Sequence, residues 1–453
     1  MGPDEGDSGG TLPGELDGET AAELARQTAV MAGAARAARD EAEAAGSLVW
    51  DPYDPTWAEN PYPIYDRLRA ANPVHRSPLG FWVFTRHADC LAILRDRRSS
   101  SDARNADPTA FPDARLAEIV SGAGAAEALE EMAPFLFRDP PDHTRLRGLV
   151  QKAFTPRVVE GLRPRVEEIC EGLLDEALDR GTADLVADYA YPLPVQLIAE
   201  LLGVPAEDQV LFKEWSDALA RGLDPDFLLP PEAIEERLTG ILNFAMYFST
   251  LIEDRRSHPG PDLLTSLIQA EEAGQVLSQA ELLSTCILLL VAGHETTVNL
   301  ISGGALALLE HPSELARFRS DPGLSRSGVE EMLRYCGPIQ LTGRALLEPM
   351  EIGGVELAQG DFALLLVASA NRDPEAFPDP DKFDVGRTEN NHLGFGFGIH
   401  HCLGAPLARL ETQVALAALL RRAGTIEPST DRFTYKENIV LRGLDSLPVT
   451  LSA

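Results

Sequence analysis

The fold of this 453-residue chain is decided by one stretch, Phe395-Gly396-Phe397-Gly398-Ile399-His400-His401-Cys402-Leu403-Gly404. Repeated glycines permit strained turns and let backbone lie close to a flat ligand. A helical pattern begins directly afterwards, so Cys402 is expected at a helix N-terminus, where free N–H groups and the helix dipole stabilise a thiolate. Such a thiolate suits a soft metal centre. A simple buried thiol is the alternative; a catalytic nucleophile is disfavoured because no partner pattern of histidine with Asn or Asp is evident.

The other four cysteines do not form a recognisable site. They are widely spaced, no Cys-x-x-Cys pair occurs, and the total of five is odd. A disulfide framework or a zinc knuckle is therefore disfavoured, and a reduced, cytoplasmic protein is expected.

Composition excludes several classes of partner. The formal net charge of -32 argues against binding to nucleic acid or to anionic lipid, which both require a basic surface. The N-terminus lacks a basic segment followed by an apolar run, so no signal peptide is expected. The most apolar stretch, residues 282–292, is too short to span a bilayer. We expect a protein that does not enter membranes.

The chain divides into two unequal parts. Residues 1–47 are an acidic extension that we expect to be disordered, although residues 19–45 are rich enough in Ala, Glu and Arg for a loose helix. No linker interrupts residues 48–453, which we interpret as one domain. Helical periodicity dominates residues 142–320, and strand-like patches recur near 80–85, 348–358, 362–368 and 438–451. The expected fold class is mainly α with minor β.

One helix combines a strong start signal with unfavourable residues in its middle. Ser278 and Glu281 form a capping-box pattern, and no proline follows until Pro312. The apolar pattern runs almost all round, which predicts a central buried helix. Yet Gly293, Thr296 and Thr297 are poor helix formers, and Glu295 is costly to bury. Such exceptions within a core helix indicate a functional site.

These motifs together resemble the cytochrome P-450 family. The Cys402 stretch matches every fixed position of that family's haem-binding loop, F-G-x-G-x-H-x-C-x-G. Ala292-Gly293-His294-Glu295-Thr296-Thr297 is similar to its oxygen-activation motif, Glu331 to Arg334 matches its E-x-x-R helix, and Phe383 to Arg387 resembles the segment that completes a Glu–Arg–Arg cluster. The resemblance covers roughly residues 50–453 and implies a single large helical domain around haem with small β-sheets.

The resemblance also implies site residues. Cys402 would bind the iron of haem b (iron protoporphyrin IX), and Glu295 and Thr296 would relay protons. The other expected cofactor contacts are His143, Arg147, Ala292, Gly293, Arg344, Phe395, Gly396, His400 and Gly404. The expected substrate pocket includes Leu289, Ile339, Leu341, Ile439 and Val440.

The implied activity is that of a monooxygenase of bacterial secondary metabolism. It inserts one oxygen atom of O2 into a small apolar organic substrate, by hydroxylation or epoxidation. Electrons are expected from NAD(P)H through a separate ferredoxin and ferredoxin reductase, since residues 138–165 hold seven basic residues against three acidic ones. A monomer is expected. Two alternatives remain open: a haem-thiolate enzyme of isomerisation, coupling or dehydration, and a non-catalytic haem-binding sensor.

Overall fold

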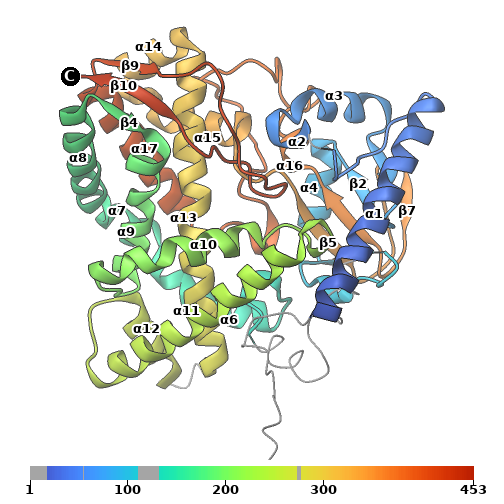
Figure 1. Ribbon diagram of the computed structural model, residues 1–453, viewed down its shortest axis with the longest axis horizontal. Helices are drawn as coiled ribbons and strands as arrows, with labels where there is room; N and C mark the ends of the chain where they lie inside the picture. Colours follow the sequence, from blue (N-terminus) through green and yellow to red (C-terminus); the bar gives the residue numbers. More distant parts are fainter. Residues whose placement is uncertain (1–17, 55, 111–131, 273–276) are drawn as a thin grey trace, which may run out of the picture.

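The structure, a computed structural model, describes residues 18–54, 56–110, 132–272 and 277–453 (Figure 1). Its α-helices are α1 (Gly18–Ala44), α2 (Thr56–Glu59), α3 (Tyr62–Ala71), α4 (His87–Arg95), α6 (Asp142–Val150), α7 (Pro156–Gly161), α8 (Arg163–Arg180), α9 (Pro192–Leu201), α10 (Phe212–Arg221), α11 (Pro231–Ser257), α12 (Leu263–Glu272), α13 (Gln279–Glu310), α14 (Pro312–Ser320), α15 (Ser325–Tyr335), α16 (Val367–Ala370) and α17 (Ala405–Arg422). Shorter helical turns include η3 (Gln151–Phe154), η6 (Asp226–Leu228) and η8 (Gly398–His400).

The strands are short and form three small sheets. They are β1 (Val74–Arg76), β2 (Trp82–Phe84), β3 (Ser99–Ser100), β4 (Thr182–Asp184), β5 (Thr342–Leu346), β6 (Met350–Ile352), β7 (Val355–Leu357), β8 (Phe362–Leu365), β9 (Thr425–Pro428) and β10 (Pro448–Ser452). The largest sheet has the order β1-β2-β8-β5-β3, with β2 and β8 parallel and the other pairs antiparallel. The expectation of a mainly α protein with minor β is confirmed.

Helix α13 is the central element of the fold. Figure 1 shows it passing through the middle of the molecule, and it packs against α9, α10, α11, α15 and α17. Ser278 and Glu281 form both bonds of the predicted capping box. The helix is long and apolar enough to cross a membrane by composition, but 72% of its most apolar window is buried inside the protein. Its apolar surface is therefore used for packing of the core.

The structure has a helix over residues 18–44, close to the range for which the composition allows a loose helix. Helix α1 occupies this range, and its side chains Leu24 and Ala35 are buried. Leu24 joins the cluster of Phe227 and Ile234, so α1 packs against η6 and α11. Arg39 fastens the far end of the helix through an ion pair with Asp51 (3.1 Å). Alanine and glutamate favour a helix, and the few apolar side chains on one face suffice for docking. The division of the chain after residue 47 remains a prediction.

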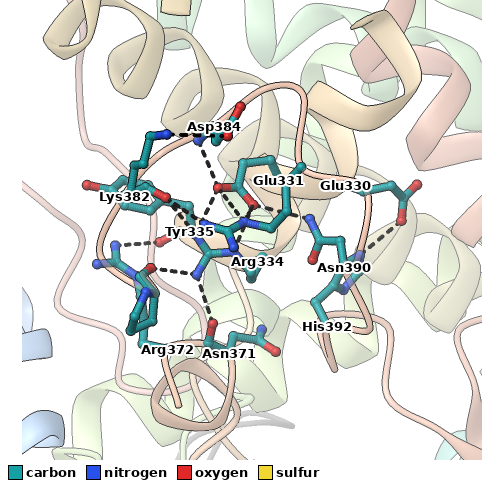
Figure 2. Close-up of polar contacts among 12 residues, drawn as sticks. Glu330, Glu331, Arg334, Tyr335, Asn371, Arg372, Lys382, Asp384, Asn390 and His392 are labelled. Atoms are coloured by element: carbon teal, nitrogen blue, oxygen red, sulfur yellow. Dashed lines mark hydrogen bonds and ion pairs between the residues drawn. The ribbon is translucent and has the colours of Figure 1, made fainter. Parts of the chain in front are cut away.

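Helix α15 contains a fully buried ion pair, to which the segment before the cysteine loop is hydrogen-bonded (Figure 2). Two guanidinium nitrogens of Arg334 donate to the carboxylate of Glu331, each at 2.8 Å, and both side chains are inaccessible to solvent. The Nε–H group of Arg387 also donates to the two carboxylate oxygens of Glu331, at 3.1 and 3.2 Å. Arg334 also binds the carbonyl oxygens of Asn371 and Pro380. The predicted Glu–Arg–Arg cluster is thus assembled, and it fixes the path of residues 371–387.

A single carboxylic acid is buried without full compensation in α17. Glu411 is 2% exposed and its Oε2 has no hydrogen-bond partner, while Cys170 of α8 lies close by. Burial raises the pKa of Glu411 to about 8. The neutral acid is therefore the form that the folded protein holds at neutral pH.

We expect Glu331→Gln to lower the free energy of unfolding by about 3–5 kcal/mol, because it leaves the buried Arg334 without a countercharge. Midpoints of urea unfolding measure the loss. Glu160→Gln is the matched control: Glu160 pairs with Arg163 at the surface, so its loss should stay below about 1 kcal/mol. Equal, small losses in both variants would show that the buried cluster contributes no net stability.

The acidity of Glu411 sets a second expectation. Its pKa rises from 4.5 in the unfolded chain to about 8 in the folded protein. Its contribution to stability is therefore fully present below about pH 4.5 and is lost as the pH rises through about 8. Thermal unfolding of wild type and Glu411→Gln between about pH 6 and pH 9 should show a shallower fall of Tm in the variant. Parallel falls in Tm would contradict the assigned shift.

Candidate functional site

The cysteine loop turns through two glycines that no other residue replaces without strain. Gly396 has a φ of +66° and Gly398 a φ of +72°, both in the left-handed region. A Cβ atom on Gly398 would lie 2.5 Å from the carbonyl oxygen of Leu94, so α4 packs directly against this turn. The backbone N–H of Cys402 donates to the carbonyl oxygen of Phe395 at 2.9 Å and closes the loop.

Cys402 lies just before the N-terminus of α17, as predicted. The helix begins at Ala405, and the N–H groups of Gly404 and Ala405 are directed at the sulfur. Burial raises the pKa of the Cys402 thiol, whereas these two N–H groups and the charge of Arg147 act in the opposite direction. A Cβ atom added to Gly404 would meet nothing within 4 Å, so free space borders the loop here.

An ionic network supports the loop from behind. The guanidinium of Arg409 lies 4.5 Å from the ring centre of Phe395 and donates to Glu330 at 2.6 Å. His392 contacts the same carboxylate at 3.0 Å (Figure 2). Burial raises the pKa of Glu330, but His392 and Arg409 outweigh it and bring the pKa to about 2. The ring of Phe395 is thereby held against one side of the loop.

Four basic side chains from three separate segments meet beside the loop, and we call them the basic cluster: His143, Arg147, Arg344 and His400. The imidazole rings of His143 and His400 lie 4.2 Å apart. Arg147 donates to the carbonyl oxygen of His401 at 2.5 Å. Burial and the charges of Arg344, His143 and Arg147 lower the pKa of His400 to about 3. The sequence predicted all four as cofactor contacts, and the structure brings them together.

The basic cluster lacks the anions that its charges require. Within the described part of the chain, Arg147 and Arg344 bond to neutral oxygens, and neither forms an ion pair. Both ring nitrogens of His143 are buried without a hydrogen-bond partner. Burial lowers the pKa of Arg344 to about 10. Two carboxylates of one flat ligand would satisfy these groups, so the residues present fit the two propionates of haem b.

The middle of α13 presents a different set of groups. Ala292 is exposed, whereas Val291, His294 and Glu295 are buried. The hydroxyl of Thr296 donates to the carbonyl oxygen of Ala292 at 2.9 Å, and Thr296 is half-buried. A Cβ atom on Gly293 would lie 3.3 Å from Ile198, so this glycine permits close packing of α9. Ala292 and Thr296 thus share an open face, while Gly293 lies toward a neighbouring helix.

Glu295 is buried in an ion pair that sequence reasoning missed. Lys436 donates to its Oε1 at 2.5 Å, and Asn299 does so at 3.4 Å. Burial raises the pKa of Glu295, but Lys436, His294 and Asn299 together hold it below its ordinary value. Lys436 lies 141 residues away in the sequence and belongs to no motif, so no local signal identifies it.

The expected pocket residues are brought together only in part. Leu341, Ile439 and Val440 belong to one apolar cluster with Phe227 and Leu229. Ile339 pairs with Leu441, and the N–H of Gln340 donates to the carbonyl oxygen of Val440, so these two segments lie side by side. Leu289 is buried in the other large cluster, among helices. The sequence also predicts a long loop over residues 99–130 as a wall of the pocket, and residues 111–131 lie outside the described residues.

Comparison with known proteins agrees with this geometry. The cytochrome P450 family model matches residues 324–440. The polyketide biosynthesis cytochrome P450 PksS of Bacillus subtilis (strain 168) is 40% identical over 416 residues, covering 89% of this chain and 99% of that protein. Cytochrome P450 monooxygenase PikC of Streptomyces venezuelae is 43% identical over 404 residues, covering 87% and 91%. The ligand-free crystal structure of Mycobacterium smegmatis CYP164A2 superposes with a TM-score of 0.80 at 41% identity, covering 88% and 98%.

Similarity at this level extends over almost the whole of each relative, and the region matched by the family model includes the cysteine loop. The chain therefore belongs to the cytochrome P450 family and is a haem-dependent monooxygenase.

Proposed function

We propose that Cys402 is the thiolate ligand of the haem iron and that the basic cluster binds the two propionates. The observation that carries this assignment is the position of two arginines without an ion pair among the described residues, Arg147 and Arg344, and of two histidines, beside a cysteine at a helix N-terminus. The haem, when bound, activates O2, and its thiolate ligand favours cleavage of the O–O bond. The side chains of Phe395 and Arg409 hold the loop so that the sulfur keeps a fixed position.

We propose further that Glu295 and Thr296 deliver protons on the open face of α13. The overall reaction converts R–H, O2, two electrons and two protons into R–OH and water, so two protons must enter a site that excludes bulk water. Glu295 is ionised and has one oxygen, Oε2, without a hydrogen-bond partner. It can therefore take up a proton, and the Thr296 hydroxyl, next in the chain, can pass one on. Ala292 leaves the space beside that hydroxyl open.

The proposed substrate is a medium or large apolar molecule of secondary metabolism. The cluster of Leu341, Ile439, Val440 and Phe227 offers apolar side chains and few charges. The relative from polyketide biosynthesis favours a polyketide-like compound. Apolar walls bind such a molecule chiefly by excluding water, and shape decides which carbon is oxidised.

The proposed electron donor is an acidic ferredoxin, served by a separate reductase and NAD(P)H in the cytoplasm. Within the basic run at residues 138–165, Arg145, Arg163 and Arg165 are paired with Glu281, Glu160 and Glu200. Lys152 and Arg157 in η3 and α7 are exposed. These positions continue directly from α6, which carries Arg147 of the site, and positive charge there would attract an acidic protein.

The ligand assignment is tested by the difference spectrum of dithionite-reduced protein with and without carbon monoxide. The wild-type protein should give a strongly red-shifted Soret band, and Cys402→Ala should lose it. Cys170→Ala, which removes a buried thiol of the core, should keep the band. Persistence of the shifted band in Cys402→Ala would overturn the assignment.

The proton-delivery role is tested by the coupling efficiency, the amount of product formed per NAD(P)H consumed. Thr296→Ala should divert reducing equivalents from product to hydrogen peroxide and lower product per NAD(P)H by roughly tenfold or more, because a positioned proton donor is lost. Thr297→Ala is the neighbouring control, since its hydroxyl only donates back to Gly293 at 3.2 Å. Equal coupling in wild type and Thr296→Ala would mean that protons arrive by another route.

A further inference from the structure

A hairpin near the C-terminus reaches from the protein edge to the middle of α13. We call it the C-terminal hairpin, residues 435–444: Tyr435 pairs with Leu444, and the N–H of Lys436 donates to the carbonyl oxygen of Gly443 at 2.9 Å. Its connecting segment carries Ile439 and Val440, which lie in the apolar cluster of the proposed pocket. One short segment therefore contacts both the proposed substrate pocket and the oxygen-side helix.

The hairpin carries one hydrogen-bond partner of the Glu295 carboxylate and contacts the other. Lys436 forms the ion pair itself. Asn299, the second donor to Glu295, lies directly under Gly443: a Cβ atom added there would be 2.0 Å from the amide oxygen of Asn299. In the described part of the chain, the Glu295 side chain has no further hydrogen-bond partner. A displacement of the hairpin would consequently move both groups that hold the acid.

The other side of the hairpin is anchored to the end of α10. The buried carboxylate of Asp224 accepts hydrogen bonds from the backbone N–H groups of Ile439 and Val440, the shortest at 2.9 Å. Asn438 donates to the carbonyl oxygen of Ala220 at 3.3 Å. Asp224 directly precedes η6, against which α1 packs. The position of the α10–η6 connection is thus linked to that of the hairpin.

Lys436 also differs from Glu295 in its access to water. The side chain of Glu295 is 3% exposed, whereas that of Lys436 is 26% exposed. An isolated carboxylate at this depth would be unstable, so the ion pair is what keeps Glu295 ionised and in place. Because the Lys436 ammonium group has access to water, it can separate from Glu295 without becoming an unpaired charge in the core.

We propose that Lys436 and Asp224 are positioning residues for Glu295, acting through the C-terminal hairpin. Lys436 sets the place of the carboxylate, and Asp224 sets the place of the segment that carries Lys436. Because the same segment bears Ile439 and Val440, one short stretch of backbone connects the proposed substrate pocket with Glu295. This inference rests on the proposed role of Glu295.

The test uses the haem-loaded full chain with a bacterial ferredoxin and its reductase, and with a macrolactone that shifts the Soret band of the wild-type protein as the probe. Lys436→Met should lower product per NAD(P)H by about tenfold, because small displacements of a catalytic group have effects of this size or larger. The solvent isotope effect on turnover should rise, while KM for the probe changes little. Lys436→Arg should restore most of the coupling, since it keeps a cation in reach.

Asp224→Asn should lower coupling in the same direction, because an amide is a weaker acceptor for the two N–H groups. Lys382→Met removes a lysine whose side chain is 61% exposed and serves as the matched control with unchanged coupling. Carbon monoxide difference spectra verify that each variant holds haem through its thiolate. If Lys436→Met fails this check, Lys436→Arg and Asp224→Asn carry the test.

Glu295→Gln separates the two possible failures. Loss of coupling in Glu295→Gln together with wild-type coupling in Lys436→Met and Asp224→Asn would overturn the positioning role alone. Wild-type coupling in Glu295→Gln itself would instead overturn the proposed proton-delivery function. If the coupling of Lys436→Arg is as low as that of Lys436→Met, a cation at position 436 does not restore the function, and the proposed role of the lysine charge is overturned.

Discussion

An anionic sulfur inside a protein is stable only where positive charge and N–H groups face it, and much of this structure follows from that requirement. The helix that begins at Ala405 supplies the N–H groups, and Arg147 supplies a nearby charge. To bring Cys402 to that helix end, the chain turns through Gly396 and Gly398 in conformations that other residues rarely adopt. The long axis of α17 is in turn fixed by its packing against α8 and α13.

The same need for compensation explains the charged groups elsewhere in the interior. Glu331 and Arg334 are completely buried and neutralise each other, with Arg387 and several carbonyl oxygens completing the set. This arrangement fixes the chain just before the cysteine loop. The basic cluster is the opposite case: among the described residues, Arg147 and Arg344 form no ion pair, and both ring nitrogens of His143 lack a hydrogen-bond partner. Buried charges that neutralise each other, as in the Glu331 cluster, indicate a structural role. Buried charges without a partner, as in the basic cluster, indicate a binding site.

Local sequence patterns predicted the parts of the site in which neighbours along the chain act together. The cysteine loop is such a case, since its glycines, Cys402 and the helix start lie within a few residues. Helix α13 is another, because the capping box and the apolar pattern are read within one segment. Side chains paired over long separations were not predictable in this way. Lys436 meets Glu295 across 141 residues, and Asp224 binds backbone 215 and 216 residues away, so neither partner carries a recognisable signal.

Helix α1 shows a second limit of composition as a guide. The acidic composition of residues 1–47 predicted disorder, with a loose helix possible over residues 19–45, and in the structure α1 buries Leu24 against the cluster of Phe227 and Ile234. A segment becomes ordered when burial of its apolar side chains against a partner surface offsets the conformational entropy that it loses. Through this docking, η6 is covered on one side by α1 and connected on the other, by Asp224, to the C-terminal hairpin.

The chemistry and the substrate preference of this enzyme therefore depend on different kinds of sequence information. The groups that we propose for oxygen chemistry are concentrated in two short segments, around Cys402 and around Glu295. The apolar cluster around Leu341 and Val440 is assembled from strand ends, a hairpin and a helical turn that are far apart in the chain. Substitutions in any of these segments reshape the pocket without touching the cysteine loop. A fold built in this way can keep one reaction while the molecule that it oxidises changes.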